Sequence, residues 1–478
     1  MYEKALSTLN ILNRVTSGIG ILKMLTENGK NMNNKVRNIM APILFITVVT
    51  FLVCIFYSKN IILFDSGDYW SRGELLWKKG FSIYNFPDAF RGYIFPLYVG
   101  IIGKVGGVNG FKILNSIIIG ILFGYLFPRL FSPDKVHPFK IICCFLLFFV
   151  LFSGLMIHPL SDLLALGMCV CSIEIYNDIF TCNSSWKKGV LLFLCGITCY
   201  FAYNIRTIYL FADIYILVML LVSIWRQQTR IIRKIGNTLL MAGGFGFAGI
   251  PQLLLNRHFG DGLSIWVPTS SLMKTQLFWG LQYQRYDTFA GTFSGHPAAQ
   301  MYFIDSVGQA LLAKEGISGF STWGEFIKFF FKYPIEIGGI YIRHFINMLL
   351  PCWPNQYVYN LDNNKVLLAL LSLIITFLFG MVICEKLSIN NLVYIKFIPL
   401  LIPVLFILPG AVEVRFFIAV YLLIIYTLGF NTDWKKLFQY IRRHLLKVII
   451  FFTLYSGVIC SIWSSCLVSE SAYKLFMY

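Results

Sequence analysis

The feature that most constrains this fold is a succession of apolar runs of about 20 residues each, separated by short basic loops. The first run, IMAPILFITVVTFLVCIFY, carries no charge across residues 39–57. A helix of this length crosses the hydrocarbon core of a bilayer and satisfies its backbone polar groups internally. Only 13% of the residues are charged, well below the share in soluble domains. The sequence therefore predicts an all-α polytopic membrane protein.

The net charge of +18 is spread between the apolar runs and does not form one basic region. Lys and Arg lie in short clusters, which is the distribution typical of cytoplasmic loops. No nucleic-acid partner is therefore expected. Most of the twelve cysteines lie inside apolar runs and none forms a CxxC pair, so we interpret them as small hydrophobic residues.

Loop charge predicts a topology of about eleven spans with a cytoplasmic amino terminus. The expected spans are residues 39–58, 111–129, 140–157, 163–181, 188–203, 207–225, 236–255, 365–384, 394–409, 416–431 and 447–467. The chain then divides into an amino-terminal arm (1–38), a membrane core (39–255) with a first external loop (59–110), a long external segment (256–364) and carboxy-terminal membrane helices (365–478). Interfacial helices are expected in the external loops. Residues 326–351 either lie on the membrane or span it.

The segment GGFGFAG has the glycine spacing of a dinucleotide-binding loop at Gly244, Gly246 and Gly249. That motif requires a preceding strand, whereas these glycines lie inside the expected span 236–255. Glycines within a membrane span allow two helices to approach closely. We therefore interpret this segment as a packing surface.

Polar side chains gather at the span ends that this topology places outside. Asp65 and Asp68 follow the first span, in IILFDSGDYWSR. The other candidates are His158 and Asp162 in HPLSD, Arg91 before GYIFP, Arg206 in YNIRT and Arg415 in VEVRFF. Three guanidiniums beside carboxylates would suit a phosphate ligand.

Each of these side chains also has a structural explanation when it is taken alone. Asp162 is a good cap for the helix that follows it, and Asp68 would cap an interfacial helix that begins at Tyr69. Arg206 lies on the same helix face as Asp213, where the two would pair. Arginines at a membrane interface commonly extend their guanidinium groups to water.

Four segments, taken in order, resemble the GT-C superfamily of membrane glycosyltransferases, which includes protein O-mannosyltransferases and the aminoarabinose transferase of lipid A. They are the D-x-x-x-Y pattern from Asp65 to Tyr69, RGYIFPLYVGIIGKVGG, HPLSDLLAL and EVRFFIAVYLL. The resemblance covers roughly the first 180 residues and is then sparse until about residue 410. Many relatives carry an acidic residue directly after the first aspartate, where this chain has Ser66.

The resemblance implies an inverting glycosyltransferase that moves a sugar from a polyprenyl-phosphate donor to a hydroxyl of a glycan, lipid or protein acceptor. Asp65 would be the catalytic base. Asp162 or Asp68 would be a second acidic group that orients the acceptor, and Asp65 with Asp162 would hold a divalent cation, Mg²⁺ or Mn²⁺, if the enzyme uses one. The donor phosphate would contact Arg91, Arg206 and Arg415, with support from His158, Glu413 and Tyr69.

The expected location is a bacterial plasma membrane, with the site on its external face and in contact with membrane lipid. Two other functions stay open. A polysaccharide polymerase has a similar span count and similar external loops, but it uses a lipid-pyrophosphate carrier. A flippase for lipid-linked sugars, or another transporter, typically has polar groups at mid-membrane and internal repeats. Here the polar groups gather at one face and no repeat is evident.

Overall fold

The apolar runs form helices because lipid offers the backbone no other hydrogen-bonding partner. The computed structural model describes residues 29–57, 60–132, 137–289, 299–351, 357–358, 365–387, 396–468 and 471–475. Within this described part, nine helices are long and apolar enough to cross a membrane. The chain is therefore an integral membrane protein with multiple spans, and the predicted all-α class is confirmed. Residues 1–28 of the predicted arm lie outside the described residues, and residues 29–38 are helical.

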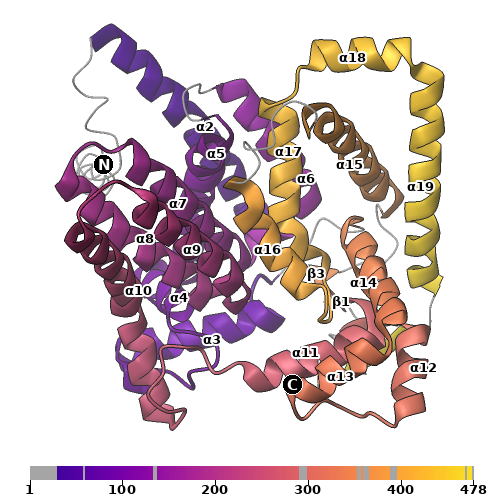
Figure 1. Cartoon of the computed structure of the whole chain (residues 1–478), viewed down its shortest axis with the longest axis horizontal. Coiled ribbons are helices and arrows are strands. Elements are labelled where there is room, and N and C mark those ends of the chain that lie inside the picture. The colour runs from indigo at the N-terminus through magenta and orange to yellow at the C-terminus, as the bar shows by residue number, and fades with distance from the viewer. Residues whose placement is uncertain are drawn as a thin grey trace.

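These nine helices correspond to the first eight expected spans and to the last one (Figure 1). They are α2 (Gly29–Phe56), α4 with α5 (Ile94–Ile121 and Phe127–Phe131, joined by a π-helical turn), α6 (Pro138–Ile157), α7 (Asp162–Thr181), α8 (Ser185–Ile205), α9 (Leu210–Arg226, with a preceding 3-10 turn Thr207–Tyr209), α10 (Ile231–Phe259), α15 (Lys365–Leu387) and α19 (Leu445–Val468).

The expected count of about eleven spans is reduced because the two runs at 394–409 and 416–431 form short helices. Helix α16 is Ile398–Ile407, with Pro399 at its start, Pro403 inside it and Pro409 just after its end. Proline limits helix extension because it lacks an N–H donor. Helix α17 (Ile418–Phe430) meets α18 (Trp434–Arg443) at a bend of 91°, and this pair gives a tenth span only if it is counted as one.

Helices α8 and α10 pack closely at glycines, as the GGFGFAG segment predicts. A Cβ on Gly244 would lie 2.0 Å from the Phe193 carbonyl oxygen, and one on Gly196 would lie 2.2 Å from the Met241 carbonyl oxygen. Side chains at these two positions would force the helices apart. This contact supports the packing interpretation of the motif.

The predicted first loop (59–110) contains α3 (Phe64–Lys79), a 3-10 turn (Ile83–Asn85) and the start of α4. Helix α3 begins at Phe64, so the predicted start at Tyr69 is wrong and Asp68 lies inside the helix instead of capping it. Helix α3 packs on α4 through Gly73, where a Cβ would lie 2.7 Å from the Val99 side chain. Helix α4 bends at Gly106 and Gly107, so the part before the bend lies within the predicted loop 59–110.

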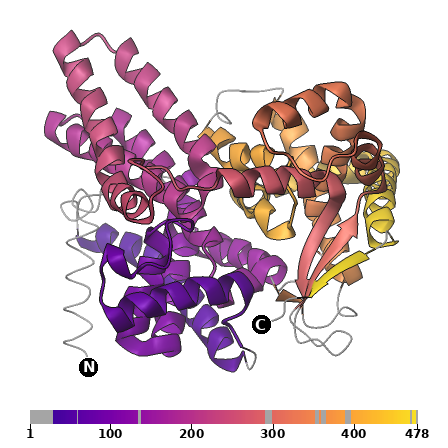
Figure 2. The ribbon, with the colours of Figure 1, turned by 90° about the horizontal axis from the view of Figure 1, so that it is seen from below.

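The segment from 256 to 364 forms short helices and three strands of a small sheet (Figure 2). The helices are α11 (Ser270–Gln282), α12 (Ser306–Glu315), α13 (Trp323–Lys332) and α14 (Pro334–Met348). Residues 326–351 are thus mainly α13 and α14, and neither is long enough to span a membrane. The sheet has the order β3 (Tyr357–Val358), β1 (Tyr283–Phe289), β2 (Ala299–Ile304), β4 (Ser471–Leu475), and its β1–β2 and β2–β4 pairs are antiparallel. The sequence analysis predicted no strands.

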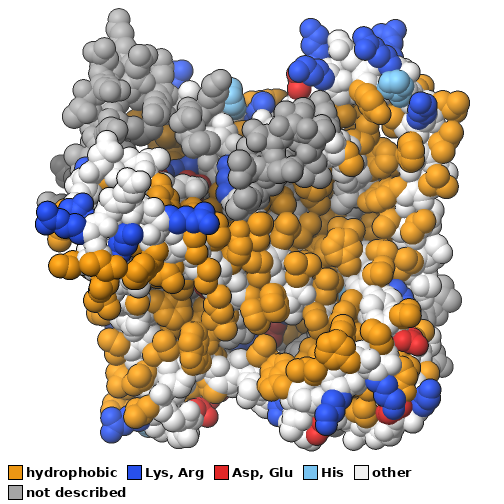
Figure 3. Space-filling model, in the orientation of Figure 1, with side chains coloured by type: hydrophobic (Ala, Val, Ile, Leu, Met, Phe, Trp, Pro, Cys, Tyr) orange, Lys and Arg blue, Asp and Glu red, His pale blue; other side chains and the backbone are white. Residues whose placement is uncertain are grey.

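Charged side chains lie at both ends of the helix bundle (Figure 3). On the face shown in Figure 3, hydrophobic side chains cover the middle, and Lys and Arg gather on α18 at the top. Helix α7 runs between the two ends: Asp162 is its first residue, and Glu174 and Asp178 near its other end both pair with Arg129, at 2.8 and 2.7 Å. A helix of this length separates its ends by about 30 Å.

Candidate functional site

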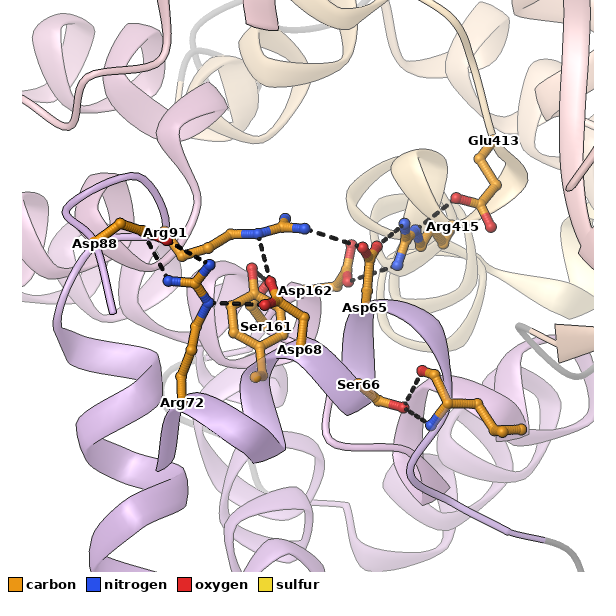
Figure 4. A network of polar contacts seen from close by, with 12 residues as sticks. Asp65, Ser66, Asp68, Arg72, Asp88, Arg91, Ser161, Asp162, Glu413 and Arg415 are labelled. Atoms are coloured by element: carbon orange, nitrogen blue, oxygen red, sulfur yellow. Dashed lines mark hydrogen bonds and ion pairs between the residues drawn. The ribbon is translucent and has the colours of Figure 1, made fainter. Parts of the chain in front are cut away.

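The predicted polar residues come together because each lies where a helix begins or ends. Asp65 is in the first turn of α3, and Asp162 is the first residue of α7. Arg91 lies just before α4, and Arg206 follows α8 directly. Arg415 lies in the 3-10 turn Val414–Phe417 that leads into α17. Figure 4 shows several of these side chains pointing toward one another.

Asp65 is held by two arginines, one on each carboxylate oxygen. Arg415 Nη2 lies 2.7 Å from Oδ2, and Arg91 Nη2 lies 3.2 Å from Oδ1. Burial by itself opposes ionisation of Asp65, but Arg415 and Arg91 outweigh it and hold the pKa of this carboxyl well below its usual range. Asp65 is therefore ionised and paired at neutral pH.

The backbone just before Asp65 is strained. Phe64 has a φ of 47°, and it is the non-glycine residue with positive φ among the described residues. Such a conformation costs a bulky residue about 1 kcal/mol or more, and this kind of strain concentrates at functional sites. The Phe64 ring packs 5.3 Å from the ring of Tyr357, which lies on β3. This packing accompanies the conformation that directs Asp65 toward the arginines.

Asp68 continues the network toward the outer part of the loop. Its two oxygens lie 2.9 Å from Arg72 Nε and 2.9 Å from Arg91 Nε, respectively. Arg72 also makes a bidentate pair with Asp88, at 2.8 and 2.9 Å. Arg91 therefore lies between Asp68 and Asp65, with its guanidinium 5.3 Å from the ring centre of Tyr69. Asp68 orients Arg91, which is a different role from the predicted helix cap.

Asp162 forms the buried side of the site. Its side chain is 3% exposed and pairs with Arg206, and its second oxygen lies 3.9 Å from Arg415 Nη1. The alternative pairing of Arg206 with Asp213 is wrong, because the Arg206 guanidinium contacts Asp162. Arg206 and Arg415 both lie against the Phe416 ring, at 4.8 and 5.4 Å from its centre. Asp162 thus brings two of the predicted arginines, Arg206 and Arg415, together on the buried side of the site.

Glu413 adds a second buried acid beside Arg415. Glu413 Oε2 lies 2.7 Å from Arg415 Nε, and the Glu413 side chain is 3% exposed. Burial raises the pKa of Glu413 to about 7, because Arg415 only partly offsets it and the charge of Asp65 adds to it. Among the predicted acids, Glu413 is therefore the group that changes charge near neutral pH.

Two tyrosines that the sequence analysis did not select also contact the site. Tyr286 on β1 lies beside Arg415, and its N–H donates to the Val412 carbonyl at 3.0 Å. Tyr357 accepts the Ser66 N–H at its hydroxyl, at 3.2 Å. Both belong to the small sheet, which brings them to the start of α3 and to the segment before α17. The content of Tyr, Thr and Phe in YQRYDTF, residue types that favour strands, was the available signal for β1.

The predicted supporting residues His158 and Tyr69 make structural contacts. His158 Nδ1 donates to the Ile61 carbonyl at 2.8 Å, and its ring packs 4.6 Å from Tyr357. Burial lowers the pKa of His158 to about 4, so the ring is neutral at pH 7. The Tyr69 hydroxyl lies 3.2 Å from Ser161 Oγ. His158 and Tyr69 thus hold the segments that carry Asp65 and Asp162.

A chain of buried amides positions the loop that carries Arg91. Asn204 Oδ1 accepts the N–H groups of Tyr93 and Ile94, both at 3.0 Å, at the start of α4. Asn204 Nδ2 donates to Gln252 Oε1 at 3.0 Å, and Gln252 Nε2 donates to the Ala89 carbonyl at 3.1 Å. These hydrogen bonds fix the backbone on both sides of Arg91.

A small cavity opens beside Arg415. Its charged wall consists of Asp162, Arg206 and Arg415. Its apolar wall comes from α16, from the 3-10 turn Val414–Phe417 and from the start of α17, and includes Pro403, Val404, Ile407 and Phe416. The free space holds about one water molecule, so a larger anion would enter only if these walls moved apart.

The carboxylates of this site do not form a ready cation site. Among the described residues, no three His, Cys, Asp or Glu side chains are grouped so that they could hold a metal ion. The predicted ligands Asp65 and Asp162 each pair with arginine. Carboxylates paired in this way do not fit a divalent cation. The metal dependence of the protein, with Mg²⁺ or Mn²⁺, stays a prediction from the sequence.

Comparisons with protein-family models, with curated proteins and with solved structures found no match to this chain. The GT-C resemblance therefore rests on the order of its four segments and on the residues that they contain.

Proposed function

We propose that this protein is an integral-membrane glycosyltransferase that transfers a sugar from a polyprenyl-phosphate donor to an acceptor hydroxyl and inverts the anomeric centre. The observation that carries the proposal is the contact of Asp65 with both Arg91 and Arg415. A displacement at a sugar phosphate requires a base for the incoming hydroxyl and positive charge for the departing phosphate. Asp65 and its two arginines would supply both.

The donor phosphate would bind Arg91, Arg206 and Arg415. Polyprenyl phosphate is already a stable leaving group, so a strong general acid is not needed. The guanidiniums would stabilise the negative charge that develops on the phosphate as the bond to the sugar breaks. The apolar wall formed by Pro403, Val404 and Phe416 supports a lipid-linked donor over a soluble sugar phosphate.

Asp65 would act as the base. The acceptor oxygen attacks the anomeric carbon while its proton moves to the Asp65 carboxylate. The bond between that carbon and the phosphate oxygen breaks, and its electron pair leaves with the polyprenyl phosphate. One displacement of this kind inverts the configuration.

The proposal places the site on the external face of a plasma membrane. The opposite end of the bundle carries α18, with Lys435, Lys436, Arg442 and Arg443. Basic segments beside membrane spans favour the cytoplasmic side. Cysteine labelling in intact cells would test this: a cysteine at Glu74 should react with an impermeant reagent, whereas one at Lys435 should not.

The direct test is transfer by the purified protein. The wild-type protein is incubated with a sugar on polyprenyl monophosphate and a cell-envelope extract as acceptor, and release of polyprenyl phosphate is measured. Asp65→Asn should lower the rate by about 100-fold or more, since a general base contributes that much. Glu74→Gln removes an exposed carboxylate from the same helix and should leave the rate unchanged. Wild-type turnover by Asp65→Asn would overturn the assignment.

A second experiment names the sugar. Cell-surface glycans of a deletion strain are compared by mass spectrometry with those of strains complemented with the wild-type protein or with Asp65→Asn. The deletion strain should lack one sugar residue of defined mass from its glycans, and only the wild-type protein should restore that sugar. This result would support the transferase. Use of lipid pyrophosphate alone would favour a polymerase, and movement of labelled lipid without a new glycosidic bond would favour a transporter.

A further inference from the structure

The positive and negative side chains of this site balance one another in number. It contains four guanidiniums, on Arg72, Arg91, Arg206 and Arg415, and four aspartates, Asp65, Asp68, Asp88 and Asp162. Glu413 is the fifth acid, and burial favours its protonated form. Each arginine that is predicted to bind phosphate already faces a carboxylate. An arriving anion therefore finds no unpaired guanidinium among them.

The carboxylates differ in how easily they can yield to such an anion. Asp162 and Glu413 are each 3% exposed, so water could not replace an arginine that either carboxylate lost. The Asp65 side chain is 34% exposed, and water can solvate it once it moves. It also contacts two of the three arginines, Arg91 and Arg415. Asp68 is equally exposed, at 35%, but of these three arginines it contacts only Arg91. Asp65 is therefore the carboxylate that water can solvate and whose displacement opens both Arg91 and Arg415 to an incoming anion.

We infer that Asp65 is the resident anion of the phosphate site: a lipid phosphate that binds Arg91 and Arg415 displaces the Asp65 carboxylate, which is then free to act as the base. This inference rests on the proposed function for its final step only. The exchange replaces one negative charge against the two arginines by another, and water solvates the displaced Asp65 carboxylate.

The exchange couples donor binding to catalysis. While its two oxygens face Arg91 and Arg415, Asp65 is a weak base. After displacement it keeps its negative charge but loses two cationic neighbours, so it binds a proton more readily. The acceptor hydroxyl then transfers its proton to Asp65 as its oxygen attacks the sugar. Without a bound phosphate the base stays paired, which disfavours proton abstraction in the absence of donor.

The test is a binding measurement with dodecyl phosphate on the purified full chain, without sugar or acceptor. If Asp65 competes with the phosphate for the arginines, Asp65→Asn binds dodecyl phosphate about tenfold more tightly than the wild type, since one strong charge pair no longer has to be broken. Arg91→Gln and Arg415→Gln bind it about tenfold more weakly or worse. Glu74→Gln, the charge-matched control on α3, binds it as the wild type does.

A cooperative thermal unfolding transition shows that each variant is folded. The binding of dodecyl phosphate is also measured with Asp65→Ala, which removes the carboxylate by a different side chain. Equal or weaker binding by both folded Asp65 variants would overturn the exchange. Dodecanol serves as the neutral probe: a gain in its affinity equal to that for dodecyl phosphate would also overturn the inference, because the effect would then be steric. Loss of transfer by Asp65→Asn without tighter phosphate binding would refute the exchange and leave the proposed function standing.

Discussion

Asp65 and Arg415 are 350 positions apart in the sequence, yet Arg415 Nη2 lies 2.7 Å from Asp65 Oδ2. The contact joins the start of α3, in the loop between α2 and α4, to the turn before α17 near the end of the chain. Arg91 completes the pair from the turn before α4. The centre of the candidate site therefore exists only when the two halves of the membrane domain are assembled.

We expect Arg415→Lys to lower transfer by about 100-fold although it conserves charge. The Arg415 guanidinium faces Asp65, Glu413 and Asp162 with three different nitrogens. A single ammonium group cannot meet all three carboxylates. The measurement is the rate of transfer, together with the affinity for dodecyl phosphate. Arg442→Lys, on exposed α18, is the control and should have no effect. Near-normal transfer by Arg415→Lys would show that only its charge matters.

We expect donor affinity to fall as the pH rises through about 7, because Glu413 has a pKa of about 7 and becomes negative beside Arg415. The folded-state pKa lies above the value of 4.5 for an unperturbed glutamate. Stability from this group is therefore fully present below pH 4.5 and is lost as the pH rises through 7. KM for a glycosyl phosphodiester donor, measured from pH 6 to 8, should rise in the wild type and stay level in Glu413→Gln. The same dependence of KM on pH in the wild type and in Glu413→Gln would contradict this prediction.

We expect Gly92→Ala to destabilise the protein by about 2 kcal/mol or more and to weaken phosphate binding. Gly92 has a φ of 66°, and a Cβ there would lie 2.2 Å from the Asn204 carbonyl oxygen. The backbone would have to move, and Arg91 would move with it. Thermal unfolding and dodecyl phosphate binding report the two effects. Gly106→Ala is the control, since no atom lies within 4 Å of its Cβ position. Unchanged binding by Gly92→Ala would mean that this loop does not position Arg91.

We expect Ser66→Asp, which introduces the acid that many members of the GT-C superfamily carry at this point of the motif, to destabilise this chain by about 3 kcal/mol or more. Ser66 is fully buried, and its hydroxyl faces the Leu63 and Ile61 carbonyl oxygens at 2.6 and 3.0 Å. A carboxylate there would meet two acceptors without a cation. Ser66→Ala, which only loses hydrogen bonds, should cost about 1 kcal/mol. Thermal unfolding separates the two variants. A stable and active Ser66→Asp protein would show that the second acid can lie at this position.

The membrane character of the chain was predictable because it depends on local composition. Nine of the expected runs form helices of spanning length within the described residues, and the exceptions are the short helices α16 and α17. Hydropathy sums over a window, so it overlooked the prolines that shorten α16 and the 91° bend that follows α17. The start of α3 was missed by five residues, because Ser66 caps the helix from inside its first turn.

The sequence by itself determined which polar residues lie at the ends of the spans, because the lengths and charges of the runs place them there. Only the tertiary structure decided how these residues pair: Arg206 with Asp162 instead of Asp213, and Asp65 with two arginines. It also brought Tyr286 and Tyr357 to the site through strand pairing. Such pairings depend on distances between segments far apart in the chain. Burial then makes an unmatched charge expensive, so the packing of the helices decides which acid meets which arginine.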